Sequence, residues 1–196
     1  MDGDRDRDLP PGQLLADGWP VRHYGPVPKF RPATWDLRIF GELADPRAEG
    51  HWSLDELYAM PQQPVVADLH CASRFSVLDL HWSGVPDRHL LALAPPARYV
   101  EHVVVWAEYG YSAALRLEDL QRPDALLALH LDGEVLPPQR GFPVRLVVPH
   151  VYSWKGPKWL RAIEYVAERR AGFWEDRGYH PVGEVWREQR FAHRDD

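Results

Sequence analysis

Residues 126–136 read Leu-Leu-Ala-Leu-His-Leu-Asp-Gly-Glu-Val-Leu, and this stretch decides the class of fold. Asp132-Gly133 supplies the positive φ angles of a tight turn, and it stands between two β-prone runs. The pattern predicts a β-hairpin with strands over 126–131 and 134–136. Because 19 proline and 14 glycine residues are also spread along the chain, an all-helical bundle is excluded.

The segments around the hairpin predict a mixed architecture. A short helix is expected to begin at the capping box Ser53-x-x-Glu56, and another is expected around Asp119. The spacing of apolar residues in 159–169 fits a helix and a strand equally, so both stay open. The fold class is therefore a mixed, β-rich α+β domain. Its further strands are predicted at 34–40, 65–69, 98–106 and 144–148.

Length and charge limit the classes of protein to which the chain can belong. Its 196 residues suit one domain, and a net charge of −6 argues against a nucleic-acid or anionic-membrane partner. No apolar run approaches the roughly 18 residues of a membrane span, and no hydrophobic signal segment follows Met1. We therefore expect a cytoplasmic protein that does not bind a membrane.

The two ends of the chain differ in composition. Residues 1–15 are charged and contain proline and glycine, which predicts a disordered, solvated tail. Residues 173–191 carry five large aromatic side chains, too many for a free tail. We expect 16–196 to form a single domain, with this aromatic-rich C-terminal segment wrapped back onto its body.

Cys71 is the first candidate for chemistry. As the only cysteine it excludes an intrachain disulfide and any all-cysteine metal site. It follows the predicted strand 65–69 and opens a polar loop in which Arg74 could stabilise a thiolate, the form that binds metals or attacks a substrate. The alternatives are a buried, small hydrophobic residue and a metal-free thiol enzyme in which Cys71 acts with a histidine.

A basic stretch is the second candidate. No acidic residue stands between Glu134 and Glu164. Arginine forks, lysine point charges and backbone N–H groups at glycine can together hold a phosphate or another anion. The alternative is a solvated basic face. The cationic residues of this interval are Arg140, Arg145, Lys155, Lys158 and Arg161.

Five strings occur in order between about residues 20 and 170. They are VRHYGPVP at 21–28, DLHC at 68–71 with WSGVP at 82–86, GYS at 110–112, GFPVRLVVP at 141–149 and KGPKWL at 155–160. Together they resemble the molybdopterin-binding domain of the sulfite oxidase superfamily. The later string GFWEDRGYH resembles the short, stand-alone bacterial members.

The resemblance implies a molybdenum-molybdopterin cofactor and an oxidoreductase that transfers an oxygen atom to or from a small substrate. Cys71 would be the thiolate ligand of the metal, and Tyr111 would be a second catalytic residue. Electrons would pass to or from a separate partner. A non-catalytic molybdopterin carrier is the alternative. The residues implied in cofactor binding are Arg22, His23, Tyr24, Arg140, Arg145, Lys155, Gly156, Pro157 and Lys158.

Two positions depart from the family pattern. Arg140 stands where many relatives have histidine or asparagine. Phe75 stands where sulfite oxidases carry an arginine that helps to bind the oxyanion, with Arg74 one residue earlier. The resemblance therefore does not carry sulfite over as the substrate.

Overall fold

The predicted hairpin is present in a computed structural model of the chain, which describes residues 8–194. Strands β8 (Leu126–Leu131) and β9 (Glu134–Val135) pair antiparallel. The turn residues Asp132 and Gly133 have φ angles of 52° and 82°, the left-handed conformation that a tight turn requires.

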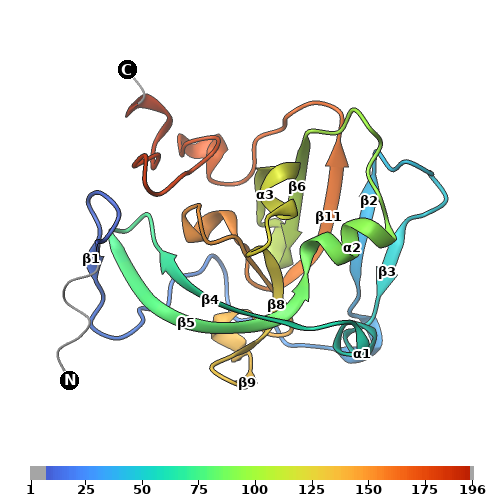
Figure 1. Ribbon diagram of the computed structural model, residues 1–196, viewed down its shortest axis with the longest axis horizontal. Helices are drawn as coiled ribbons and strands as arrows, with labels where there is room; N and C mark the ends of the chain where they lie inside the picture. Colours follow the sequence, from blue (N-terminus) through green and yellow to red (C-terminus); the bar gives the residue numbers. More distant parts are fainter. Residues whose placement is uncertain (1–7, 195–196) are drawn as a thin grey trace.

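Strand β8 belongs to a six-stranded sheet. Its central path runs β1-β5-β8-β10, with β4 paired to β5 and β9 paired to β8. β5 is long and curved, and in Figure 1 it sweeps below β4 from the side of β1 toward α2. The other strands of this sheet are β1 (Leu14–Leu15), β4 (Gln63–His70), β5 (Phe75–Pro86) and β10 (Arg145–Val147).

A second sheet has five strands in the order β3-β2-β11-β6-β7. The segment 159–169, in which the spacing of apolar residues fitted a helix and a strand equally, contains strand β11. This strand lies between β2, to which it is parallel, and β6, to which it is antiparallel. The strands are β2 (Leu37–Gly41), β3 (Gly50–Trp52), β6 (His102–Ala107), β7 (Ser112–Arg116) and β11 (Leu160–Val166).

Short helices connect the strands. At the first, Ser53 and Glu56 form the predicted capping box, in which each side chain accepts a hydrogen bond from the other residue's backbone N–H. The α-helices are α1 (Leu54–Ala59), α2 (Asp87–Leu93) and α3 (Leu117–Gln121). Single 3₁₀ turns cover Pro32–Thr34, Glu108–Gly110, Pro138–Arg140, Ser153–Lys155, Glu175–Arg177 and Ala192–Arg194.

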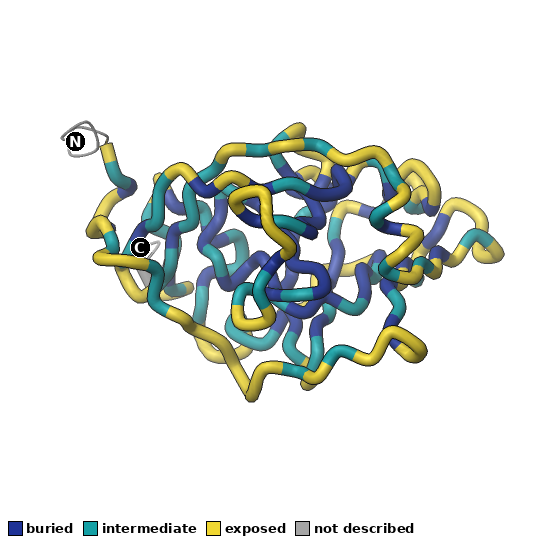
Figure 2. The backbone as a smooth tube through the Cα atoms, turned by 90° about the horizontal axis from the view of Figure 1, so that it is seen from below, coloured by how far each residue is buried: buried dark blue, intermediate teal, exposed yellow. Residues whose placement is uncertain are grey.

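The two sheets share one hydrophobic core. Leu37 and Val105 reach it from the second sheet, and Leu127 and Leu146 reach it from the first. Buried backbone accordingly concentrates inside the molecule, with exposed loops around it (Figure 2). Removal of this apolar surface from water stabilises the fold. The prediction of a β-rich α+β domain is confirmed.

Residues 8–15 belong to the folded body, although the composition of 1–15 predicted a disordered tail. Gln13 is only 7% exposed, and Leu14 and Leu15 form strand β1 beside β5. Proline and glycine precede β1, but its backbone finds hydrogen-bond partners on the edge of a sheet, where Leu14 N–H donates to the carbonyl of Arg74 at 3.0 Å. Residues 1–7 of the predicted tail lie outside the described residues.

The C-terminal segment lies back on the domain. Val151 and Glu184 form an isolated β-bridge, as do Tyr179 and Phe191. Trp174 packs with Tyr179 beside a small cluster of buried residues that includes Tyr152. Within residues 8–194, no helix has the length and apolar character needed to cross a membrane.

Candidate functional site

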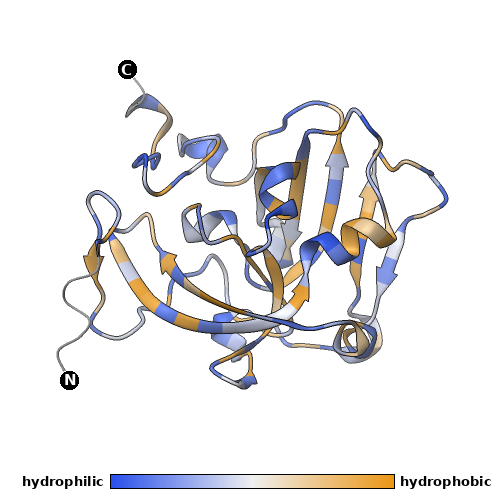
Figure 3. Ribbon diagram, in the orientation of Figure 1, coloured by the Kyte–Doolittle hydropathy of each residue, from blue (hydrophilic) through white to orange (hydrophobic). Residues whose placement is uncertain are grey.

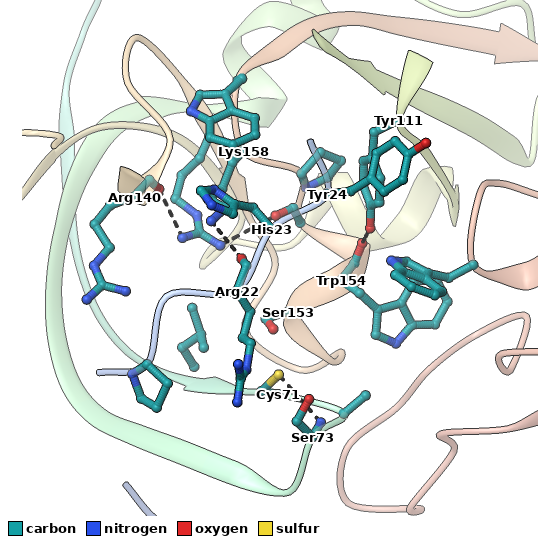
Figure 4. Close-up of a pocket in the computed structure, with 18 of the residues that line it drawn as sticks. Arg22, His23, Tyr24, Cys71, Ser73, Tyr111, Arg140, Ser153, Trp154 and Lys158 are labelled. Atoms are coloured by element: carbon teal, nitrogen blue, oxygen red, sulfur yellow. Dashed lines mark hydrogen bonds between the residues drawn. The ribbon is translucent and has the colours of Figure 1, made fainter. Parts of the chain in front are cut away.

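One cavity of about 310 Å³ brings together residues that are far apart in the sequence. Cys71 and Tyr111 both line it. So do all of the residues predicted to bind the cofactor except Lys155, namely Arg22, His23, Tyr24, Arg140, Arg145, Gly156, Pro157 and Lys158. Figure 4 shows how the labelled side chains surround this space.

Cys71 follows β4 directly, at the start of the turn into β5. Its backbone N–H donates to the carbonyl of Phe75 at 2.8 Å, and its own carbonyl accepts from Gln13 Nε2 at 3.1 Å. The turn therefore holds Cys71 at a fixed place in the wall of the cavity. Its sulfur faces the backbone N–H of Ser73 at 3.5 Å. Arg74, expected to stabilise the thiolate, is not among the lining residues.

Arg145 brings a buried cation to the cavity from strand β10. It is 5% exposed, and its Nη1 donates to the carbonyl of Arg140 at 3.1 Å. Its Nε is buried without a hydrogen-bond partner, and no carboxylate among residues 8–194 pairs with the guanidinium. Burial and the nearby charge of Arg140 lower the pKa of Arg145 to about 10. An anion is the missing partner of such a group.

Arg140 and Lys158 add two further cations beside Arg145. The Arg140 guanidinium lies 3.9 Å from the ring centre of Trp19 and donates to that residue's carbonyl at 2.7 Å. Lys158 Nζ donates to the carbonyls of Arg22 and Gln139 at 2.7 and 3.0 Å. Burial and the two arginines lower the pKa of Lys158 to about 7. The positive charges of the two arginines thus oppose that of Lys158, whereas the charge of Cys71 acts in the other direction.

The segment 22–24 closes one side of the cavity. His23 packs against Trp159 at 5.1 Å between ring centres, and Tyr24 packs against Phe173 at 4.5 Å. Burial and Lys158 lower the pKa of His23. In Figure 4 the side chain of Arg22 extends toward the Cys71 end. The segment therefore adds hydrogen-bond donors to the wall of the cavity.

Glycines bring backbone close to the cationic cluster. A Cβ at Gly156 would lie 2.5 Å from the carbonyl oxygen of Leu146, so no larger residue fits there without movement. Gly141 has a φ of 128°, and a Cβ there would lie 2.7 Å from that of Arg145. The chain can thus turn tightly around the arginine.

Lys155 is the predicted cofactor-binding residue that the structure does not bring to the cavity. It is fully buried, and its Nζ donates to Glu175 Oε1 at 2.6 Å and to the carbonyls of Ala114 and Pro181. Arg161 is likewise paired, with Asp36 and Glu108. These two cations of the basic stretch have structural partners.

Tyr111 lines the cavity, but its hydroxyl already donates to the carbonyl of Trp154 at 2.6 Å. Burial and the charges of Glu175 and Tyr179 raise its pKa well above the usual range. The phenol therefore keeps its proton at neutral pH.

Sequence reasoning missed several aromatic residues of the wall. Trp19, Trp154, Trp174 and Tyr179 all line the cavity. The concentration of aromatic residues in 173–191 was the available signal for the last two, but it indicated packing and not a place beside Cys71.

Residues 24–174 match the protein family described as the oxidoreductase molybdopterin binding domain. The chain belongs to this family. The resemblance found in the sequence is thereby confirmed, and the chain is a member of a family of oxidoreductases.

This molybdopterin-binding domain resembles two curated proteins along most of its length. It is 37% identical over 190 residues to the uncharacterized oxidoreductase YuiH of Bacillus subtilis strain 168, and the match covers 96% of this chain and 94% of that protein. It is 32% identical to the putative protein-methionine-sulfoxide reductase subunit YedZ1 of Azospira oryzae. That match covers 88% of this chain and 66% of the relative.

A solved structure supports the fold of the molybdopterin-binding domain. The crystal structure of the sulfane dehydrogenase SoxCD from Paracoccus pantotrophus superimposes with a TM-score of 0.68, over 76% of this chain and 42% of that chain. At 20% sequence identity, this likeness concerns the fold alone.

The cavity fits the cofactor that the family name implies. Three cations have no carboxylate partner among the described residues 8–194, and one of them has an orphaned buried Nε, so the cluster matches an anionic ligand. Cys71 offers one soft sulfur at the same cavity. Within residues 8–194, no three His, Cys, Asp or Glu side chains gather to hold a metal ion. Among the lining residues, Cys71 would therefore be the ligand of a metal that the cofactor carries.

Proposed function

We propose that the chain is a molybdopterin-dependent oxidoreductase that transfers an oxygen atom to or from a small substrate. The observation that carries the proposal is the joint placement of Cys71 and the cationic cluster of Arg140, Arg145 and Lys158 in one cavity. Buried positive charge of this kind calls for a resident anion, and a lone thiolate nearby suits a soft metal centre.

The lining residues would have two separate roles, one in binding the cofactor and one in ligating the metal. Arg140, Arg145 and Lys158 would hold the anionic part of the cofactor, with backbone at Gly156 close enough to contact it. Cys71 would ligate the metal. When bound, the cofactor supplies the redox and oxygen-transfer chemistry. The aromatic wall, with Trp154 among its residues, excludes water from the reacting atoms.

Electron exchange would involve a second protein or a soluble acceptor. The relative from Azospira oryzae is described as a subunit of a reductase, which supports a separate electron-transfer partner for this chain as well.

The experiment that tests the proposal is elemental analysis of freshly purified protein together with its ultraviolet–visible spectrum. We expect about one molybdenum per chain and a thiolate-to-metal charge-transfer band. Protein without molybdenum that loses activity when Cys71 is alkylated would show a metal-free thiol enzyme instead. Protein that contains molybdenum but turns over no oxygen-atom donor or acceptor would instead be a non-catalytic molybdopterin carrier.

The variant Cys71→Ser isolates the role of the sulfur. We expect loss of most activity and of the charge-transfer band, because a hydroxyl is a poor ligand for a soft metal. The unfolding temperature should change little, since the backbone of Cys71 makes the contacts that hold its turn. Wild-type turnover by Cys71→Ser would contradict the role as metal ligand.

A further inference from the structure

Three tyrosines line the cavity, Tyr24, Tyr111 and Tyr179. Tyr24 is half-exposed, and Tyr111 has no donor left to offer. The hydroxyl of Tyr111 donates its proton to the carbonyl of Trp154, and it also forms a side-chain hydrogen bond with Trp174, whose indole N–H can only donate. Its single donor and one of its acceptor positions are therefore used within the protein. Tyr111 stiffens the wall of the cavity but does not reach out to a ligand.

Tyr179 has the opposite arrangement. Its ring is held by three aromatic neighbours, Trp154, Trp174 and Phe191, at 5.3, 5.0 and 5.1 Å between ring centres. Its backbone N–H donates to the carbonyl of Trp174. Its hydroxyl, by contrast, makes no hydrogen bond to any residue within 8–194, although the side chain lines the cavity. The structure therefore orients this ring firmly and leaves its O–H group available.

The position of Tyr179 is at the Cys71 end of the cavity. Tyr179 and Ala72, the residue that follows Cys71, pack against the same cluster of buried residues, which includes Tyr152. Ala72 and Ser73, which follow Cys71, line the same cavity. A ligand beside the sulfur would meet the free hydroxyl.

The segment that carries Tyr179 is anchored. Glu175 accepts from the backbone N–H of Ala114 at 3.0 Å and from Lys155 Nζ at 2.6 Å, so it ties the C-terminal segment to β7 and to the turn Ser153–Lys155. In Figure 1 the C-terminal segment is drawn in orange-red to dark red and runs from β11 toward the upper left of the view. Tyr179 itself lies beyond residues 24–174 that match the family.

We propose that Tyr179, and not Tyr111, donates the hydrogen bond that holds the terminal oxygen of the substrate beside Cys71. The proposal rests on the proposed function, since it names the residue that donates a hydrogen bond to the oxygen to be transferred. Tyr179 would recognise an oxygen atom that accepts a hydrogen bond. An uncharged oxide and an oxyanion both carry such an atom. A phenol that stays protonated suits this role, because it gives a donor without adding charge.

The test uses the holoenzyme and two unreactive probes, dimethyl sulfone for an uncharged oxide and sulfate for an oxyanion. Binding is followed through the fluorescence of the tryptophans beside Tyr179, and KM and kcat are measured for oxygen-bearing substrates of both kinds. We expect Tyr179→Phe to weaken the binding of whichever probe the wild type prefers, and to raise KM, by about fivefold, the effect of one neutral hydrogen bond.

Two further variants serve as references. Tyr99→Phe removes a hydroxyl that bonds Glu42 on the surface, outside the cavity, so it should bind the probe like the wild type. Tyr111→Phe should lower the unfolding temperature, because it loses the bond to Trp154, and it should bind the probe with nearly wild-type affinity. Molybdenum content of all variants should match the wild type.

Any of three outcomes would overturn the role of Tyr179. Tyr179→Phe could bind the probe with wild-type affinity, or Tyr111→Phe could lose more probe affinity than Tyr179→Phe. The third outcome is a wild type that binds neither probe. Absence of molybdenum from the purified wild type would overturn the proposed function instead. In that case the probe titration still decides whether the Tyr179 hydroxyl holds an oxygen acceptor.

Discussion

Arg145 places an unpaired guanidinium in the interior, and this has two opposite consequences. Without cofactor the buried charge costs free energy; with cofactor it forms a charge-assisted contact. We expect Arg145→Met to weaken cofactor retention by about 2–5 kcal/mol, while the cofactor-free variant unfolds at the same urea concentration as the wild type or at a higher one. Molybdenum content after gel filtration and urea titration measure the two effects.

The matched control for Arg145 is Arg88→Met. Arg88 is exposed and bonds Gln63 and the carbonyl of Pro123, away from the cavity. It should retain cofactor like the wild type. An Arg145→Met protein with full molybdenum content would show that the guanidinium holds no part of the cofactor.

Asp87 is a second buried ionisable group without a hydrogen-bond partner among residues 8–194. It is fully buried, and neither carboxylate oxygen has a hydrogen-bond partner within residues 8–194, so burial raises the pKa of Asp87 well above its usual range. Because the folded protein keeps this proton to a higher pH than the unfolded chain does, its contribution to stability is lost as the pH rises above about 4.

For Asp87→Asn we therefore predict a gain in stability over the wild type that grows with pH. The difference in the free energy of unfolding should increase between pH 5 and pH 8 by up to about 1.4 kcal/mol per pH unit. Urea unfolding at several pH values measures it, with exposed Asp55→Asn as the control. Parallel pH profiles of wild type and Asp87→Asn would contradict the prediction.

At the scale of single residues, the sequence revealed the cationic cluster but not which cations are free. Arg140, Arg145 and Lys158 meet in the cavity, whereas Lys155 stands in the same acid-free interval and points elsewhere. Its partner Glu175 is twenty residues further along the chain. Local composition cannot reveal a pairing that tertiary structure creates.

At the scale of elements, the buried ion pair Lys155–Glu175 attaches the C-terminal segment to the body of the domain. Both side chains are almost completely buried, so removal of one leaves the other charge without a partner. We expect Lys155→Met to lower the free energy of unfolding by about 3–5 kcal/mol, and Lys155→Met with Glu175→Leu to recover part of that loss. Urea unfolding of the two variants measures both values.

The control for this pair is Arg122→Met, which breaks the exposed ion pair with Asp124. A solvated pair contributes about 0–1 kcal/mol, so this variant should stay close to the wild type. If Lys155→Met cost no more than Arg122→Met, the buried pair would not anchor the segment.

Strands were predictable where their local pattern was strong. β8 and β9 followed from the Asp-Gly turn, whereas β5 was not predicted although it pairs with three other strands. Polar residues alternate with apolar ones along much of it, which favours a strand and is visible as changes of colour in Figure 3, but Gly84 and Pro86 at its end favour a turn. Its neighbours complete its hydrogen bonds, so tertiary pairing decides its structure.

At the scale of the whole molecule, segments near the two ends of the described chain contact each other and the turn at Cys71. Both segments lie on the left of Figure 1, the side of β1. Gln13 bonds the carbonyl of Cys71, and Arg190 Nη2 donates to the carbonyl of Pro11 at 3.0 Å. The position of the proposed metal ligand thus depends on segments almost the full length of the chain apart.

Arg190 is the residue through which this dependence can be tested. It is 1% exposed, and besides Pro11 it pairs with Glu188 at 2.6 Å. Arg190→Met keeps the apolar volume but removes the link, so we expect the free energy of unfolding to fall by about 1–3 kcal/mol. Amide exchange should rise first in residues 8–15 and then in the turn at Cys71, with the core strand β11 unaffected. Hydrogen exchange measured by mass spectrometry follows each segment. Uniform exchange across the chain would instead mean that Arg190 stabilises the domain as a whole and does not couple its two ends.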